Sequence, residues 1–97
     1  MVKTYCVYIL ANKRGGTLYC GATSDLLGRV WQHKNDLVDG FTKTYGVHTL
    51  VYYEATNSRE AAFNREKQIK KWKRQWKINL IQQTNPLWRD LYDELTQ

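Results

Sequence analysis

Tyrosine, arginine, histidine and carboxylate side chains occur in this sequence in an order that could serve one phosphodiester-cleaving site. Tyr8 and Tyr19 lie in two apolar segments, Arg29 and His33 follow four residues apart, and Glu66 comes further along. Phenols and imidazoles can orient or deprotonate water, a guanidinium can stabilise charge on a phosphate, and a carboxylate can bind a divalent cation. This chemistry requires a fold that brings the five side chains together.

Three strands are predicted where apolar, β-branched and aromatic residues concentrate. These segments are residues 5–11, 17–21 and 48–54. The stretch 12–16 joins the first two strands, because its glycines supply the positive φ angles of a tight turn. We therefore expect a hairpin followed, after a helix, by a third strand.

Two longer helices and one loop are predicted between and after the strands. Capping residues at 23–25 predict a helix that runs to about residue 36 or 37. A polar, glycine-containing stretch at 39–46 is expected to be a loop. Ser58 then predicts the start of a basic helix that covers residue 59 to about residue 73 or beyond.

Two shorter helices are predicted after the basic helix, at 75–83 and 87–95. Asn85 and Pro86 separate them, because proline disfavours helix at the residue before it. The residues of the last helix expected to face inward are Leu87, Trp88, Leu91 and Leu95. The order ββαβααα predicts an α+β fold, a three-stranded and largely antiparallel sheet flanked by helices.

The length of the hairpin loop predicts which residues face each other across it. If residues 13–16 form the loop, Leu10 faces Tyr19 and Tyr8 faces Gly21. Opposed residues share a sheet face, as do residues two apart on one strand. Tyr8 and Tyr19 are therefore expected on one face as diagonal neighbours, roughly 7–8 Å apart between backbone positions. A one-residue slip would place them on opposite faces.

Helical periodicity places the other three candidate side chains at the margins of apolar helix faces. His33 falls at the edge of the apolar arc of the first helix and Arg29 just beyond it. Their four-residue spacing puts them side by side, and we expect both to border a cleft without entering the core. Glu66 lies at a similar boundary on the basic helix.

The segment 59–77 carries the whole net charge of the chain. The formal net charge is +6, and this segment contains eight Lys/Arg and two Glu. A polyanionic partner would be steered to this one place, although a charge run most often marks a solvated helix face. The candidate nucleic-acid-binding residues in the segment are Lys67, Lys70, Lys71, Lys73 and Arg74.

Three larger side chains of the same segment are predicted to have structural roles. Arg65 falls within the apolar arc of the basic helix, which indicates an ion pair with a nearby carboxylate. Trp72 and Trp76 fall within the same arc, so core positions are favoured over platforms for stacking nucleobases.

Length and composition indicate a single domain spanning residues 1–97. The 97 residues are 42% hydrophobic and 13% aromatic, which excludes a disordered chain. No apolar run approaches the roughly 20 residues that span a bilayer, and the N-terminal residues lack a signal-peptide pattern. We therefore expect a cytoplasmic protein. Cys6 and Cys20 are expected to be buried free thiols, since the predicted register directs them to opposite faces.

Taken together, the ordered residues resemble the GIY-YIG nuclease superfamily. The resemblance rests on Tyr8, ten intervening residues, Tyr19-Cys20-Gly21, then Arg29, His33 and Glu66. It covers roughly residues 4–80, which leaves a C-terminal helical extension at about 81–97. The segments 65–70 and 85–91 are similar to small stand-alone bacterial members of the superfamily.

The resemblance implies a role for each residue. Tyr19 would be a general base or a water-orienting phenol, and Tyr8 would help to hold the water or the scissile phosphate. Arg29 would stabilise the charge developing on that phosphate. Glu66 would bind one divalent ion, with Mg²⁺ as the expected cofactor. His33 would support these groups or act as an alternative base.

One position departs from the superfamily pattern, and one further residue is implied. Ala22 follows Gly21 where many members have lysine. Because free tyrosine titrates near pH 10, a tyrosine base needs nearby positive charge, which Arg29, the metal or His33 would have to supply. Asn79 lies where several members have another polar site residue.

Three functions are compatible with these features. The first is a magnesium-dependent endonuclease that hydrolyses phosphodiester bonds in DNA, or in RNA or another structured nucleic acid. The second is a catalytically silent module that binds nucleic acid through the basic helix, and the third is a protein-interaction module. We expect nucleic acid as the partner, DNA before RNA, a monomeric protein and no membrane partner.

Overall fold

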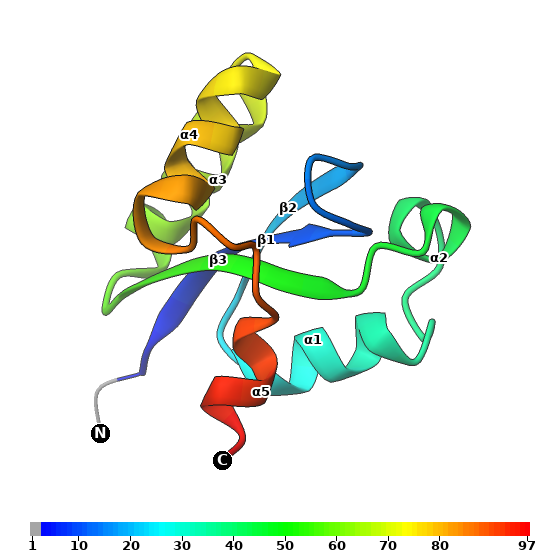
Figure 1. The fold of residues 1–97 in the computed structure, drawn as a ribbon. Coiled ribbons are helices and arrows are strands. Elements are labelled where there is room, and N and C mark those ends of the chain that lie inside the picture. Colours follow the sequence, from blue (N-terminus) through cyan, green and yellow to red (C-terminus); the bar gives the residue numbers. More distant parts are fainter. Residues whose placement is uncertain (1–2) are drawn as a thin grey trace.

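The computed structural model describes residues 3–97, which form a three-stranded sheet with helices on both sides (Figure 1). The elements are β1 (Tyr5–Ala11), β2 (Leu18–Thr23), α1 (Leu26–Lys34), α2 (Phe41–Tyr45), β3 (Thr49–Thr56), α3 (Arg59–Lys71), α4 (Arg74–Thr84) and α5 (Leu91–Leu95). The predicted α+β class is therefore confirmed. Within the described residues, the helices are too short or too polar to cross a bilayer.

β1 is the central strand of the sheet, whose order is β2-β1-β3. Both pairings are antiparallel, and Leu10 lies opposite Tyr19 and Tyr8 opposite Gly21. The register predicted from the loop length is thus confirmed, and Tyr8 and Tyr19 share one face. The pairing with β3 shifts at a bulge between Ile9 and Leu10.

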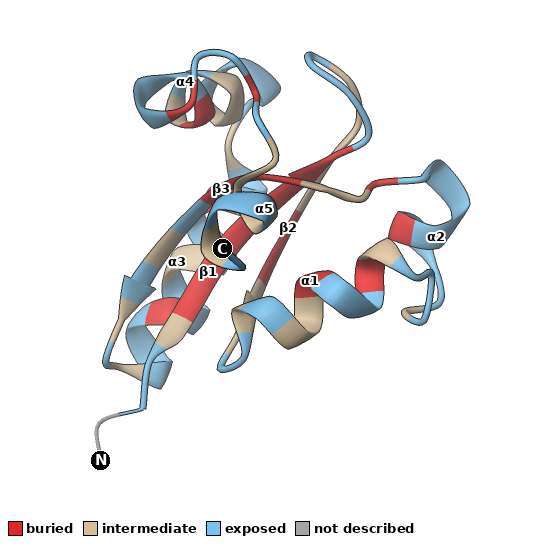
Figure 2. Cartoon of the chain, turned by 60° about the horizontal axis from the view of Figure 1, so that its bottom comes forward, coloured by how far each residue is buried: buried red, intermediate tan, exposed pale blue. Residues whose placement is uncertain are grey.

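Alternate residues of β1 point into two cores on opposite faces of the sheet. Val7 and Ile9 pack with residues of α3 and α4, whereas Tyr8 and Leu10 pack with residues of α1 and α5. Figure 2 shows β1 buried along nearly its whole length. Burial on both faces explains why this strand is a continuous apolar run rather than an alternating one. The same alternation decides which side chains can reach which helix.

The segment 39–46, expected to be a loop, contains the helix α2. It follows Gly40 and ends at Gly46, whose φ of 62° is a left-handed conformation that glycine adopts without strain. Five helical residues are too few to show a 3.6-residue periodicity, so the prediction of a loop was wrong. The side chain of Thr42 is buried and joins α2 to the body of the domain.

The basic helix is shorter than expected. α3 ends at Lys71, because Trp72 and Lys73 both adopt extended conformations before α4 begins. Trp72 is half-buried and packs against the core, but Trp76 is 56% exposed. The expected core position of Trp76 is therefore wrong, since the break in the helix turns α4 away from the arc on which it was placed.

The ion pair predicted for Arg65 is present. Its Nε donates to Oε1 of Glu54 at 2.6 Å, and the hydroxyl of Tyr52 donates to the other carboxylate oxygen at 2.6 Å. The Arg65 guanidinium carbon also lies 5.1 Å from the centroid of the Trp72 ring. These contacts fix α3 to β3 on the side away from Tyr8.

The C-terminal segment is helical only in its second half. Leu87 is 68% exposed rather than inward-facing, and Trp88 is buried in a turn with a φ of 56°. The helical expectation for residues 87–90 was therefore wrong, because the turn after Pro86 takes the chain back towards β3. Leu91 and Leu95 pack against the core as predicted.

Asn85 attaches this returning segment to the sheet. Its buried side-chain amide donates to the backbone carbonyls of Val51 and Arg89 at 3.0 and 2.9 Å. Its Oδ1 accepts from the backbone N–H of Arg89 at 3.0 Å. One side chain thus satisfies three backbone groups, each of which would be costly to leave unpaired inside the protein.

We expect Asn85→Ala to lower the free energy of unfolding by about 2–3 kcal/mol, because it leaves the buried carbonyl of Val51 without this donor. Denaturant titration measures the change. The control is Asn79→Ala, which removes an exposed asparagine and should alter stability by no more than about 0.5 kcal/mol. Equal effects of the two substitutions would contradict the anchoring role of Asn85.

Candidate active site

Three aromatic rings meet on the face of the sheet that carries Tyr8. The ring centroids of Tyr8 and Tyr19 lie 6.3 Å apart, and those of Tyr8 and His33 lie 5.9 Å apart. Tyr19 and His33 are separated by 5.4 Å. Side chains from β1, β2 and α1 therefore converge here, as the hairpin register and the spacing along the first helix predict.

His33 lies inside the protein rather than at its edge. The Tyr8 hydroxyl and His33 Nε2 are 3.1 Å apart, and His33 Nδ1 lies 2.9 Å from the Thr42 hydroxyl. His33 is 1% exposed, so the expectation that it borders a cleft is wrong. The physical reason is α2, which covers the imidazole and supplies a buried hydroxyl to its second nitrogen.

Burial controls the protonation of these groups. Desolvation, followed by the neighbouring Tyr19, raises the pKa of Tyr8 to about 12, and Arg29 partly opposes the rise. Desolvation, then the charges of Arg29 and His48, lower the pKa of His33 below its ordinary value of 6.5. At neutral pH, Tyr8 therefore keeps its proton and His33 is uncharged.

One arrangement of protons satisfies both hydrogen bonds in the series from Tyr8 through His33 to Thr42. The Arg29 guanidinium opposes the rise in the pKa of Tyr8, although no hydrogen bond between these two side chains is among those described for residues 3–97. The Tyr8 hydroxyl then donates to an unprotonated Nε2 of His33. Nδ1–H of the same ring donates to the Thr42 hydroxyl, whose oxygen accepts. His33 thus holds Tyr8 in a fixed direction.

Tyr19 differs from Tyr8 because it is only half-buried. Its ring lies 6.2 Å from the ring of Phe41, with the planes 29° apart. The ammonium of Lys70 lies 5.9 Å from the Tyr19 ring centroid. Access to solvent and a nearby cation make Tyr19, rather than Tyr8, the phenol that could meet a substrate water.

Arg29 is half-buried on α1, one turn before His33. Its guanidinium donates to the side-chain oxygen of Gln32 at 3.3 Å, and its charge acts on Tyr8 and His33. A planar guanidinium with further free donors is suited to a phosphate. The structure therefore brings Arg29, His33 and the two tyrosines together.

Glu66 approaches this group from α3, which packs against β1 and β2. Its side chain is 17% exposed and its carboxylate lies 3.3 Å from the ammonium of Lys70. Behind the larger effect of burial, its negative charge helps to raise the pKa values of Tyr8 and of the Cys20 thiol. Glu66 is therefore within electrostatic reach of the tyrosines, although no hydrogen bond joins it to them among the described residues.

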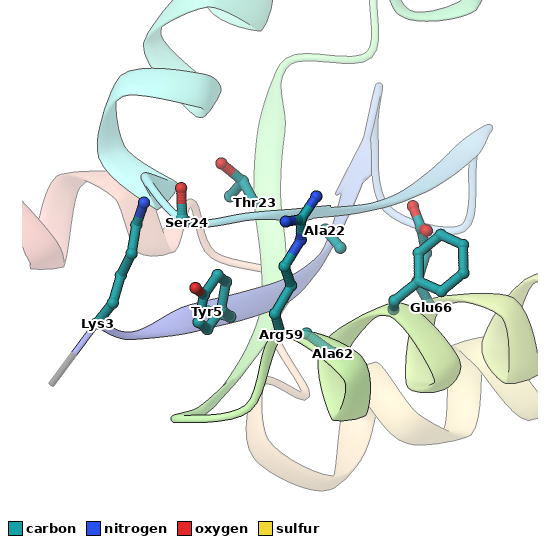
Figure 3. A pocket seen from close by; sticks show the side chains of 9 residues that line it. Lys3, Tyr5, Ala22, Thr23, Ser24, Arg59, Ala62 and Glu66 are labelled. Atoms are coloured by element: carbon teal, nitrogen blue, oxygen red, sulfur yellow. The ribbon is translucent and has the colours of Figure 1, made fainter.

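Glu66 also lines one end of a hollow of about 570 Å³ between β1, β2 and α3 (Figure 3). Neither Tyr8 nor Tyr19 lines this hollow, because their side chains point to the other face of the sheet. Ala22, where many superfamily members have lysine, lies in it. Glu66 therefore lies between the sheet face that carries the two tyrosines and the hollow on the α3 side.

The single carboxylate of Glu66 is better suited to Mg²⁺ than to a metal ion whose ligands all come from the protein. In residues 3–97, no group of three or more His, Cys, Asp or Glu side chains could hold a metal ion. Mg²⁺ is commonly bound through one or two carboxylates, with substrate phosphates and water completing its shell. A single acidic side chain matches this pattern, provided that Lys70 is displaced.

The basic residues predicted to bind nucleic acid do not form one uniform surface. Lys67 lies 4.3 Å from the centroid of the Phe63 ring, and Lys70 pairs with Glu66. Lys71 and Lys73 are exposed.

Arg74 is placed differently from the expectation, because its guanidinium donates to the backbone carbonyls of Gly15 and Gly16 at 2.6 and 2.5 Å. These two bonds hold the β1–β2 loop to α4. We therefore interpret Arg74 as a structural residue of the hairpin rather than a free phosphate ligand.

Asn79 is exposed on α4, where its Oδ1 accepts from the side-chain amide of Gln75 at 3.0 Å. The contacts described for residues 3–97 do not bring it to the tyrosines or to Glu66. Two residues absent from the sequence prediction do contact the site, Phe41 beside Tyr19 and Thr42 beside His33. Both belong to α2, whose formation the sequence pattern did not indicate.

Residues 4–79 match the family model described as the GIY-YIG catalytic domain. A UPF0213 protein of Staphylococcus haemolyticus is 36% identical over 83 residues, covering 86% of this chain and 99% of the relative. A UPF0213 protein of Clostridium perfringens is 39% identical over 75 residues, covering 77% of this chain and 80% of the relative.

A solution NMR structure of a UPF0213 protein from Bacillus halodurans is also similar, with a TM-score of 0.56 and 28% sequence identity. The similarity covers 90% of this chain and 92% of the other. The match therefore extends over the sheet, the helices around it and the positions of the candidate site residues.

Gly21→Ala is expected to disturb the site through a steric clash. A Cβ atom at this position would lie 2.5 Å from the Tyr8 hydroxyl oxygen and 2.6 Å from the ring carbon that bears it. Because this ring is 1% exposed, the clash should lower the free energy of unfolding by about 1–3 kcal/mol. Denaturant titration measures the loss, and Ala22→Val on the same strand is the milder control. Stability equal to wild type in Gly21→Ala would contradict the close packing.

The lowered pKa of His33 predicts a particular pH dependence of stability. The folded protein resists protonation of this ring, whereas the unfolded chain accepts the proton near pH 6.5. The contribution of uncharged His33 to the free energy of unfolding is therefore complete above that pH and is lost as the pH falls below it. Unfolding titrations between pH 5 and pH 8, a range chosen around the free imidazole value of about 6.5, should show a shallower dependence in His33→Gln. Identical slopes in wild type and His33→Gln would exclude a contribution from His33.

Proposed function

Because this chain belongs to the GIY-YIG catalytic domain family, we propose that it is a divalent-metal-dependent endonuclease that hydrolyses phosphodiester bonds in DNA. The observation that carries the proposal is the convergence of Tyr8, Tyr19 and His33, with ring centroids 5.4–6.3 Å apart, beside Arg29. A purely structural aromatic cluster would not require an arginine and a glutamate at its border.

Tyr19 orients the attacking water and accepts its proton, directly or through a second water. It is the accessible phenol of the pair, and the Lys70 ammonium lies 5.9 Å from its ring centroid. This ammonium places positive charge beside Tyr19, where the alanine at position 22 provides none.

Tyr8 acts as a buried positioning residue behind Tyr19 and not as a base, because it is 1% exposed. With a pKa of about 12 it remains a neutral phenol at neutral pH. His33 and Thr42 hold its hydroxyl in one direction, so the site does not have to reorganise when the substrate arrives. His33 is in this reading a positioning residue that acts through Tyr8.

Arg29 and Glu66 complete the site on the substrate side. Arg29 donates hydrogen bonds to the non-bridging oxygens of the scissile phosphate as negative charge builds up on them. Glu66 supplies the carboxylate for a divalent cation such as Mg²⁺, which when bound would polarise the phosphate and lower the pKa of coordinated water. Lys70 pairs with this carboxylate at 3.3 Å, and the cation takes its place when it binds.

A catalytically silent nucleic-acid-binding module is the second candidate function. The specific observation in its favour is the same ion pair, because Lys70 occupies the carboxylate that a metal would need. Cleavage assays separate the two functions, since the silent module would bind nucleic acid without hydrolysing it.

Purified protein is expected to cleave duplex, branched or single-stranded DNA with Mg²⁺ or Mn²⁺, and not in the presence of EDTA. Tyr19→Phe and Glu66→Gln should each reduce the rate by about 100-fold or more, because they remove a proton acceptor and a metal ligand. Gel assays with end-labelled substrates measure the rates.

Matched controls exist for both substitutions. Tyr53→Phe and Glu60→Gln make the same chemical changes at exposed positions and should cleave at the wild-type rate. Cleavage that persists unchanged in Tyr19→Phe and Glu66→Gln would show that a contaminant is responsible. Binding without cleavage in wild type would support the silent module instead.

A further inference from the structure

The hollow that Glu66 closes at one end contains two cations that the candidate active site does not use. Lys3 precedes β1 and Arg59 is the first residue of α3, and both line the hollow (Figure 3). Among the described residues, neither has a carboxylate within 4 Å. Unpaired positive charge in a concave surface concentrates anions.

The position of Arg59 disfavours a structural explanation. A cation at the N-terminus of a helix is repelled by the helix dipole, which slightly destabilises the helix. The cap of α3 is provided by Ser58, whose hydroxyl accepts from the Ala61 N–H at 3.1 Å, so Arg59 is not needed for capping. Its side chain is exposed and points into the hollow (Figure 3).

Hydroxyl and aromatic groups complete the lining. Thr23 Oγ1 already accepts from the Asp25 N–H at 2.9 Å, so its own O–H is available to donate into the hollow. Ser24 beside it is exposed, and Phe63 presents a ring that is 51% exposed. Tyr5 adds a second ring and a phenol hydroxyl to the lining. Cations, hydroxyls and aromatic rings are the groups that bind a phosphate and the sugar or base attached to it.

The size and spacing of the hollow match a strand of nucleic acid. Its volume of about 570 Å³ is within the roughly 300–1,000 Å³ of sites that hold small organic ligands. Arg59 and Glu66 are seven residues apart on one helix, about 10.5 Å along its axis. That length corresponds to roughly three nucleotides of rise in a duplex strand. A strand with its scissile phosphate near Glu66 would therefore reach Arg59 with a phosphate a few nucleotides away.

We infer that the hollow is a second phosphate site, in which Arg59 and Lys3 hold a backbone phosphate of the nucleic-acid strand displaced by a few nucleotides from the one near Glu66. The inference rests on the proposed function, because it requires nucleic acid at the candidate active site. It adds a binding role for α3 at the end opposite the predicted basic residues. Arg59 fixes the strand's register but does not touch the reacting atoms.

The salt dependence of binding tests the site directly. Each phosphate neutralised by a protein cation adds about one unit to the slope of log affinity against log salt. With the DNA strand that wild type binds best, measured in EDTA so that no cleavage occurs, Arg59→Gln should reduce the slope by about one unit and weaken binding at low salt. Arg14→Gln, which removes an exposed arginine of the hairpin loop, is the matched control and should change the slope less.

A neutral phosphate placed at each position in turn locates the contact. In wild type, one methylphosphonate a few nucleotides from the cleavage position should weaken binding, and in Arg59→Gln the same replacement should have a clearly smaller effect, because only Lys3 remains to contact that phosphate. Arg14→Gln should keep the wild-type pattern. Thermal unfolding of each variant establishes that the fold is intact, which is expected because Arg59 forms no ion pair within residues 3–97.

The outcomes for this site and for the nuclease are distinguishable. Binding whose slope and methylphosphonate pattern are the same in Arg59→Gln and wild type would overturn the second phosphate site, while cleavage could still occur. A reduced slope in a protein that never cleaves would support the second site and reject the nuclease. Absence of nucleic-acid binding by wild type at low salt would overturn both.

Discussion

A buried hydrogen-bonded chain from Tyr8 through His33 to Thr42 is the interaction on which the candidate site depends. It joins the central strand to α1 and α2, and it does so with polar groups that water cannot reach. Each of these polar groups would be costly to bury without a hydrogen-bond partner. The hydrogen bonds between them therefore keep the cluster in one arrangement. Gly21 belongs to the same constraint, because any larger side chain there would occupy the space of the Tyr8 phenol.

The sheet explains why the site lies at an edge rather than in a central cleft. β1 separates two cores, and the phenols belong to one face while α3 covers the other. The charge of Glu66 can raise the pKa of Tyr8 because β2 is an edge strand. Within residues 3–97, no further strand lies beyond β2 to separate the side chains of α3 from the other face of the sheet. The substrate surface that we propose extends around β2, from the aromatic face near Tyr19 to the hollow beside α3.

Local rules were sufficient for some of these features and insufficient for others. The register of the hairpin followed from its loop length, and the ion pair of Arg65 followed from a charge inside an apolar arc. The burial of His33 could not be predicted, because it depends on α2, a helix too short to leave a periodic pattern. The exposure of Trp76 depends on a two-residue break between helices that no strong breaker residue marks. In both cases tertiary contacts, not local propensity, decided the outcome.

Arg74 contacts the hairpin through the carbonyl oxygens of Gly15 and Gly16, and not through any side chain of the loop. A contact of this kind depends on the path of the backbone, which the positive φ of Gly15 and the close packing of Gly16 against Asn12 help to set. Substitutions at Lys13 and Arg14 can therefore accumulate without loosening the strand that carries Tyr19. An insertion or deletion in the same loop would move the two carbonyls out of reach of Arg74.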